Sequence, residues 1–500
     1  MNGATAATRP GRARGVTRVP DRTGTGPCRG VTRWRMAALG WMLAMAAPPV
    51  SAQDTTEPTV LWERDELRMT GSVEGIASGQ THRGAWNGLA ARYGPPGLSN
   101  RASWGEVVLA PGLNAGWQVA PELALYGGIS LVAAGTLGLD VYGSGDRGAV
   151  LLERAFIGLR TSYPDGMWNL DISSGAQPYI VGSGMLIAQG AGNGFSRGAV
   201  SLMPRRAFAN TAIARLSNGG FAAEAFWLDA NEVPSADTAT QLAGGLIQYR
   251  WDPWTRVGFT GFQAIRSTLP YPIAPAGLVE NGREGLVSWH GFGEVDGARL
   301  GLPGASFRGE FAVQRNDRID LAANAWFLEA AYRFAALPWL PRLSYGYASF
   351  SGDRPGTTRV ERFDPLFYGN GLQNWFFGAS GGYSLLNTNV DVHRVALDLM
   401  PSQRDFVKLL YLRSSANQTN SPIQFGQATQ VAVQDGNITV TSGVPTAHLL
   451  DEIYVQWTRL LTPSVALTGW ATSAWPGAGL RAIGGEKTWQ ALGLTLSVQF

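Results

Sequence analysis

The chain has 500 residues, with 40 Lys and Arg, 37 Asp and Glu, and an isoelectric point near 9.0. Residues 1–52 hold eight of the arginines and one acid, Asp21, so the remainder carries 40 − 8 = 32 basic and 37 − 1 = 36 acidic residues, a net charge near −4. The basic isoelectric point is therefore no evidence for nucleic-acid binding, and the single cysteine, Cys28, excludes a small disulfide-stapled scaffold.

The first element in chain order is the stretch "RWRMAALGWMLAMAAPPVSAQD", which begins at Arg33. Two arginines precede an apolar run from Met36 to Ala47, and small residues follow at positions 50–52. This order predicts a secretory signal peptide with an N-terminal extension over residues 1–52, cleaved before Gln53. A membrane anchor is less consistent, because about 12 apolar residues fall short of the roughly 20 that a spanning helix needs.

From Leu67 to the end, short runs alternate between large apolar and polar residues, and helical periodicity is weak. Glycine makes up 65 of the 500 residues and charged residues only 15%, against averages of about 7% and about 25%. The last run, "LGLTLSVQF" at 492–500, shows the pattern well, with Leu492, Leu494 and Leu496 on one face. The sequence therefore predicts one large all-β unit.

The connections between these runs are of two kinds, and the two kinds alternate. Short turns are predicted at 120–122, 163–167, 217–220, 252–254, 300–304, 336–341, 401–404 and 461–464. Between them lie longer polar or Gly-rich stretches, at 78–102, 177–205, 267–283, 351–389 and 416–447. Short turns on one side and long loops on the other are typical of a transmembrane antiparallel β-barrel in the bacterial outer membrane.

The eight short turns set the strand number. With both termini in the periplasm, eight turns join nine hairpins, which gives about 18 strands, and one missed turn would give 16 or 20. We expect residues 53–66 to be a short periplasmic segment and residues 67–500 to form the barrel. Lipid then buries the apolar faces, and the aromatic Phe500 at the end resembles the signal that the outer-membrane assembly machinery recognises.

A resemblance to a known family follows from residues 337–369, "LPWLPRLSYGYASFSGDRPGTTRVERFDPLFYG". A strand rich in Tyr and Gly (345–347), a Ser-Gly-Asp (351–353) and a Phe-Asp-Pro-Leu-Phe (363–367) resemble the alginate-export family of outer-membrane β-barrel porins. The resemblance implies an 18-stranded monomer that passes acidic polysaccharide through an arginine-rich constriction. One position departs from it, because Ala176 stands where the family often has a basic residue.

Alternation places basic and acidic residues in nearly equal numbers on the predicted lumen face. We expect the substrate-binding residues to be Arg154, Arg160, Arg308, Arg333, Arg394, Glu310 and Glu329. Arg308 and Arg333 are expected to be neighbours on adjacent strands, in a basic ring for carboxylates, since planar guanidinium groups suit carboxylates. The same charges could instead be ion pairs that stiffen the wall, in which case the protein would be a general diffusion porin.

An embedded hydrolase is the remote alternative. Of the four histidines, only His290 shares a predicted lumen face with a serine and acids, namely Ser288, Glu294 and Asp296, and these form a row along one strand instead of a convergent site. No His or Cys cluster has metal-ligand spacing. We therefore predict a channel without enzymatic activity, cofactor or metal, whose partners are an anionic polysaccharide or solute, outer-membrane lipid and lipopolysaccharide, and no nucleic acid.

Overall fold

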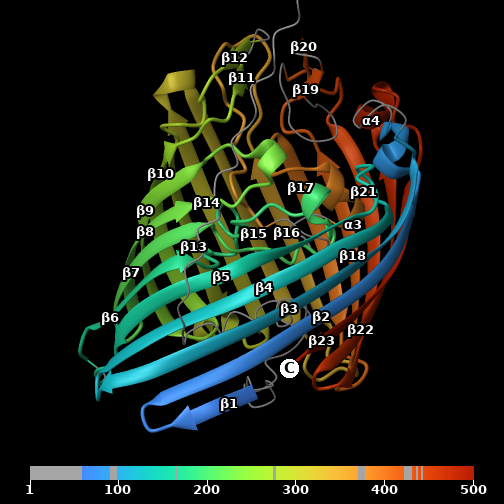
Figure 1. Cartoon of the computed structure of the whole chain (residues 1–500). Helices are drawn as coiled ribbons and strands as arrows, with labels where there is room; N and C mark the ends of the chain where they lie inside the picture. Colours follow the sequence, from blue (N-terminus) through green and yellow to red (C-terminus); the bar gives the residue numbers. More distant parts are fainter. Residues whose placement is uncertain are drawn as a thin grey trace, which may run out of the picture.

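The computed structural model describes residues 59–90, 98–164, 166–273, 277–369, 378–421, 431–434, 437–440 and 443–500, so the predicted signal peptide lies outside the described residues. One sheet of 19 strands contains β1 (Thr59–Arg64) and, after subtracting it, 19 − 1 = 18 strands that close into a barrel (Figure 1). These 18 are β2 (Leu67–Arg83), β3 (Arg101–Ala120), β4 (Leu123–Leu139), β5 (Arg147–Thr161), β6 (Asn169–Ala176), β7 (Asn210–Asn218), β8 (Phe221–Asp229), β9 (Gln241–Asp252), β10 (Thr255–Arg266), β13 (Val287–Asp296), β14 (Ala305–Asn316), β15 (Leu321–Arg333), β16 (Arg342–Phe350), β17 (Val390–Leu399), β18 (Asp405–Ser415), β21 (His448–Thr462), β22 (Val465–Pro476) and β23 (Trp489–Gln499).

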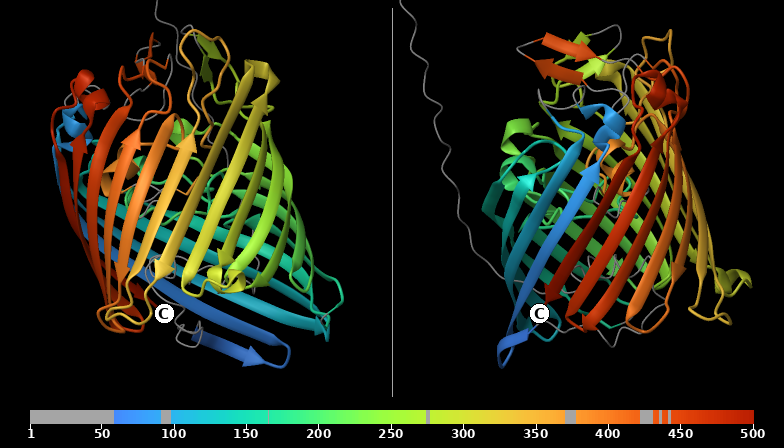
Figure 2. Two further views of the ribbon diagram at one scale, coloured as in Figure 1. Left: turned by 180° about the vertical axis from the view of Figure 1, so that it is seen from behind. Right: turned by 90° about the vertical axis from the view of Figure 1, so that its right-hand side faces the viewer.

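The ring closes because β2 pairs with β3 on one side and with the last strand, β23, on the other. Closure gives each of the 18 strands a hydrogen-bonded neighbour on both sides over at least part of its length, as a spanning sheet requires. The predicted barrel and its 18 strands are confirmed, and the first barrel strand, β2, begins at Leu67. The strand β1 extends the sheet below the C-terminus, where it pairs with the first residues of β2 (Figure 2).

The predicted alternation of short and long connections holds with one exception, since the connection between β14 and β15 on the long-loop side spans only 317–320. All eight short turns fall between consecutive strands at the positions expected from the sequence. The long connections run over 84–100, 177–209, 267–286, 351–389 and 416–447, and two of them contain the small hairpins β11 (Tyr271–Ile273) with β12 (Gly277–Val279) and β19 (Val431–Gln434) with β20 (Asn437–Val440). Figure 1 shows these hairpins at the end of the barrel opposite the C-terminus.

Side-chain burial follows the period of two along each strand. On β3, Val107 and Leu109 point outward and are about half exposed, at 48% and 51%, whereas Glu106 and Val108 point inward and are buried. Exposed apolar side chains recur on the outer face of the other strands, for example Phe311, Leu328 and Leu494. Because so much contiguous apolar surface is unfavourable in water, lipid must cover this face.

Within the described residues, no helix is long and apolar enough to cross a membrane. The α-helices of the described part of the chain, α3 (Ala379–Ser384) and α4 (Ala478–Ala482), are short and belong to connections between strands.

The last strand offers a test of which face meets lipid. Leu494, at the middle of β23, is 54% exposed on the outer face, and Thr495 faces the lumen. Replacing Leu494 with Arg should lower the free energy of unfolding in lipid vesicles by roughly 2–4 kcal/mol, because a charge near the bilayer midplane meets hydrocarbon. Thr495→Arg should cost less. Equal losses in the two variants, measured by denaturant titration, would show that the strand register is wrong.

Candidate functional site

Two long connections that were expected to be external loops instead enter the barrel. The segment 177–209 follows β6 and the segment 351–389 follows β16, and inside the lumen they meet at a parallel bridge between Ile187 and Phe367. The Ala188 amide donates to the Phe367 carbonyl at 2.8 Å. Met185, Ile187 and Phe363 are completely buried. The lumen therefore holds a hydrophobic core of its own, and the site must lie in the space that remains beside it.

Four buried glutamates on the barrel wall hold these segments in place, and we call them the glutamate anchors. Each is less than 10% exposed and accepts at least one backbone N–H from an inward-folded segment. They are Glu106 on β3, Glu153 on β5, Glu310 on β14 and Glu452 on β21. A carboxylate buried against main-chain donors satisfies both groups, which would otherwise be left without a partner away from water.

The geometry is similar at the four anchors. Glu106 accepts from Ser201 N at 3.0 Å and Leu202 N at 2.9 Å, and Glu452 accepts from Ser380 N and Gly381 N, both at 2.9 Å. Glu153 accepts from the amides of Arg206 at 2.7 Å and Ala207 at 2.8 Å. Glu310 accepts from Ser183 N at 2.5 Å and contacts His290 Nε2 at 2.8 Å.

A cluster of charges lines the lumen face of β14 to β18, and we call it the wall cluster. Its members are Arg308, Glu329, Arg342, Arg394, Asp398 and Lys408. Glu329 is the hub: Arg308 donates to it twice, at 3.1 and 2.9 Å, and Arg394 donates to it at 2.9 Å. Arg342 lies between Glu329 and Asp398, at 3.4 and 3.3 Å. Four cations against two carboxylates leave a net charge of +2.

The predicted contact between Arg308 and Arg333 is wrong. In the register of β14 and β15, the residue opposite Arg308 is Glu329, whereas Arg333 lies four residues further along β15, opposite Arg342 on β16. Arg333 therefore neighbours Arg342 on the lumen face, just as Arg256 neighbours Arg250. Like charges directly opposite each other on a ladder repel, so the pair of Arg333 and Arg342 raises the local affinity for an anion.

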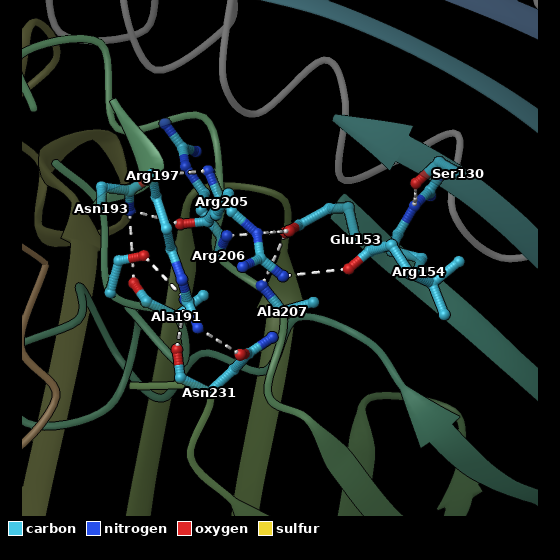
Figure 3. Close-up of polar contacts among 12 residues, drawn as sticks. Ser130, Glu153, Arg154, Ala191, Asn193, Arg197, Arg205, Arg206, Ala207 and Asn231 are labelled. Carbon is cyan, nitrogen blue, oxygen red and sulfur yellow. Dashed lines mark hydrogen bonds and ion pairs between the residues drawn. The ribbon is translucent and has the colours of Figure 1, made fainter. Parts of the chain in front are cut away.

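A second group of basic residues lies where the segment 177–209 meets β5, and we call it the loop cluster (Figure 3). It comprises Arg154, Arg197, Arg205 and Arg206 around the anchor Glu153. Arg205 Nε donates to Glu153 at 3.1 Å, with both side chains buried, and Arg154 Nε donates to Ser130 Oγ at 2.9 Å. The side chain of Arg206 is exposed.

Arg197 is bound by the protein through neutral oxygens. It donates to the carbonyls of Gly192, Asn231 and Glu232 and to the side-chain oxygen of Asn231, at 2.6 to 3.0 Å. Burial and the neighbouring Arg205 lower the pKa of Arg197 to about 10. The group is therefore still charged at neutral pH, and no carboxylate bonds directly to it in the part of the chain that the structure describes.

The two clusters stand across the barrel from each other. In the order of strands around the ring, eight strands lie between β5 and β16 in either direction. The wall cluster extends over β14 to β18 and so is centred on β16, opposite the loop cluster on β5.

The structure separates the predicted site residues into groups with different surroundings. Arg308, Arg394 and Glu329 belong to the wall cluster, Arg333 adjoins it, and Arg154 belongs to the loop cluster. Arg160 stacks on Tyr126 at 5.6 Å, opposite Asp171. Glu310 is an anchor that bonds with Ser183 and His290 and forms no ion pair with Arg308.

Sequence reasoning missed several members of the site, for different reasons. Alternation places Arg342, Asp398 and Lys408 on the lumen face, as it does the selected residues, so it does not distinguish between them. Arg197, Arg205 and Arg206 fell in or beside a segment expected outside the barrel. Glu153 was hidden by a β-bulge, because the register skips from Arg154 to Leu152 opposite β4 and turns Glu153 inward.

The residues of the hydrolase alternative do not converge. His290 contacts the anchor Glu310, Glu294 pairs with Arg256, and Asp296 accepts from the amide of Ala298. Each is engaged by a different partner, so no nucleophile, base and orienting group meet. Among the described residues, no three His, Cys, Asp or Glu side chains are arranged to hold a metal ion.

Comparison with known proteins gives one family match. The model of the alginate export family matches residues 293–492, which confirms the resemblance and covers the whole wall cluster. No curated protein matches the chain. Three solved structures from Pseudomonas aeruginosa are similar in fold: OpdK with vanillate (TM-score 0.49, 9% identity, 86% of this chain and 98% of that chain), OccK5 (0.48, 7%, 86% and 98%) and OccK2 with glucuronate (0.46, 11%, 86% and 96%). Likeness at this level carries no argument about the solute.

The anchors can be tested one at a time. Glu106→Gln removes the charge that the Ser201 and Leu202 amides bind, and hydrogen bonds to charged groups contribute about 1.5–3 kcal/mol each. Amide exchange in this segment, followed by mass spectrometry, should speed up by at least about tenfold. The control is Glu122→Gln, at an exposed short turn. Unchanged exchange in Glu106→Gln would show that the glutamate does not hold the segment.

Proposed function

We propose that this outer-membrane barrel is a passive channel for anionic solutes, with uronate polymers such as alginate as the substrate class. The observation that carries the proposal is the excess of positive charge in the wall cluster, where Arg333 and Arg342 lie opposite each other without a carboxylate between them in the register. The match of residues 293–492 to the alginate export family supports it.

The chemistry of a uronate chain suits this surface. Each sugar carries one carboxylate, and a guanidinium binds a carboxylate through two parallel N–H donors. Glu329 holds Arg308, Arg342 and Arg394 in fixed orientations, so less side-chain entropy is lost when a carboxylate arrives. Glu329 also screens part of the charge of these arginines, so each carboxylate of the polymer binds weakly enough to dissociate and move to the next site.

The loop cluster supplies the opposite side of the path. The loop cluster lies outside the residues matched by the family model. It places Arg205 and Arg206 in the lumen. At position 176, where the family often has a basic residue, this chain has Ala176. We infer that these arginines provide the charge missing at position 176. One chain closes the barrel by itself, so a monomer is sufficient for transport.

Bilayer recording with the variant Arg333→Gln, Arg342→Gln tests the proposal. The wild-type channel should prefer chloride to potassium, and oligouronates should block its current more than neutral oligosaccharides do. The double variant should lose the chloride preference and bind oligouronates at least about tenfold more weakly, since two charge-assisted contacts are removed.

The matched control is Arg459→Gln, which removes one cation from the outer face near a short turn, where it pairs with Asp405. Cation selectivity in the wild type, or current block by oligouronates that persists in the double variant, would contradict the proposal. The wall cluster would then only stiffen the barrel wall. Anion selectivity without stronger block by oligouronates would indicate a general diffusion porin.

A further inference from the structure

The outer face of the barrel carries a row of polar and aromatic side chains near the end that holds the long loops. A row of residues runs directly from strand to strand across β16, β17, β18, β21 and β22: Tyr347, His393, Arg413, Asp451 and Trp475. Their chain neighbours, such as Val392, Arg394, Leu412 and Glu452, are buried on the lumen side. The row therefore points toward the membrane, where an isolated charge is costly.

The depth of the row explains how charges are tolerated there. Tyr347 lies three residues before the end of β16, His393 three residues after the start of β17, and Arg413 two residues before the end of β18. All three distances are counted from the end of the barrel that carries the long loops. At about 3.3 Å per residue the row lies within about 10 Å of the strand ends, in the half of the wall nearer the long loops and the outer leaflet.

The two carboxylates near the row are already satisfied by the protein. Asp451 Oδ1 accepts from Tyr411 Oη at 2.7 Å, and Asp451 Oδ2 lies 2.9 Å from His448 Nε2. In the row above, Asp391 accepts from Ser349 Oγ at 2.6 Å and from Asn417 Nδ2 at 3.0 Å. These hydrogen bonds leave both carboxylates charged, and Asp451 also forms an ion pair with Arg413, at 3.8 Å.

The donors, in contrast, remain available. The Arg413 side chain is 50% exposed, and Asp451 Oδ1 lies 3.8 Å from its Nη1, which is longer than a hydrogen bond. His393 is exposed, and its Nδ1 lies 2.8 Å from Tyr345 Oη. If the tyrosine donates, the proton of the imidazole is on Nε2, which becomes a second outward donor. The Tyr347 ring packs against His393, with centroids 4.7 Å apart.

We propose that Arg413 and His393 bind a phosphate of the outer-leaflet glycolipid, the phosphorylated sugar headgroup of lipopolysaccharide, while Tyr345 and Tyr347 contact its sugar. The observations that favour this occupant are the direction of the side chains, their depth, and the pairing of a guanidinium with an imidazole donor between aromatic rings. This site is on the opposite face of the wall from the lumen, so it does not depend on the transported solute.

Native mass spectrometry of the folded barrel in detergent tests the site with lipid A as the probe. Wild-type protein should retain bis-phosphorylated lipid A more strongly than lipid A from which both phosphates have been removed. Arg413→Gln with His393→Gln should weaken binding of the phosphorylated form by about tenfold, because charge-assisted bonds to phosphate are lost. Binding of the dephosphorylated form should not change.

The control variant is again Arg459→Gln, on the outer face at the other end of the barrel, and it should bind like the wild type. Equal binding of the two lipids by the wild type overturns the proposal even if the double variant fails to fold. Unchanged affinity in a folded double variant also overturns it. So does a wild-type dimer that the double variant abolishes, since the row would then be an interface between two copies.

Discussion

The interior of this barrel depends on the need of buried backbone amides for acceptors. Once segments 177–209 and 351–389 leave water for the lumen, each of their unpaired N–H groups costs free energy unless it finds a partner. Four wall glutamates provide these partners, and the apolar side chains between them, including Met185 and Phe363, then pack as a core. The position of the loop cluster follows, because it is held by Glu153 itself.

The same requirement explains why balanced charges in the sequence give an unbalanced path. Counted along the strands, acids and bases on the lumen face nearly cancel. The anchors Glu106, Glu310 and Glu452, however, accept hydrogen bonds from main-chain amides, a histidine or hydroxyl groups, and among the described residues they form no ion pair with an arginine or lysine. The carboxylates left to the wall cluster are Glu329 and Asp398, and the cations around them are in excess.

Much of the fold could be predicted because it depends on local rules. Period-two alternation and the segregation of connections by length are properties of single hairpins, and they gave the strand number and the eight turns. Whether a long loop stays outside or folds inward depends on distant anchors. The Ser-Gly-Asp and Phe-Asp-Pro-Leu-Phe stretches illustrate this: Asp353 binds the Arg362 side chain and Asp364 binds Arg283, so these family motifs fix an inward loop instead of touching solute. The bulge at Glu153 could not be predicted either, because one inserted residue reverses the face of the sheet to which the next side chains point.

Consecutive residues on one strand thus lie in two different environments, the lumen and the membrane side of the wall. On β17, Arg394 points inward to Glu329 and His393 points outward beside Tyr345. On β21, Glu452 anchors a loop in the lumen, and its neighbour Asp451 bonds with Tyr411 on the membrane side. Because the pleat isolates the two faces, changes on one side need not disturb charges on the other. A barrel wall one residue thick can therefore hold a path for an anion inside and a headgroup site outside at nearly the same depth.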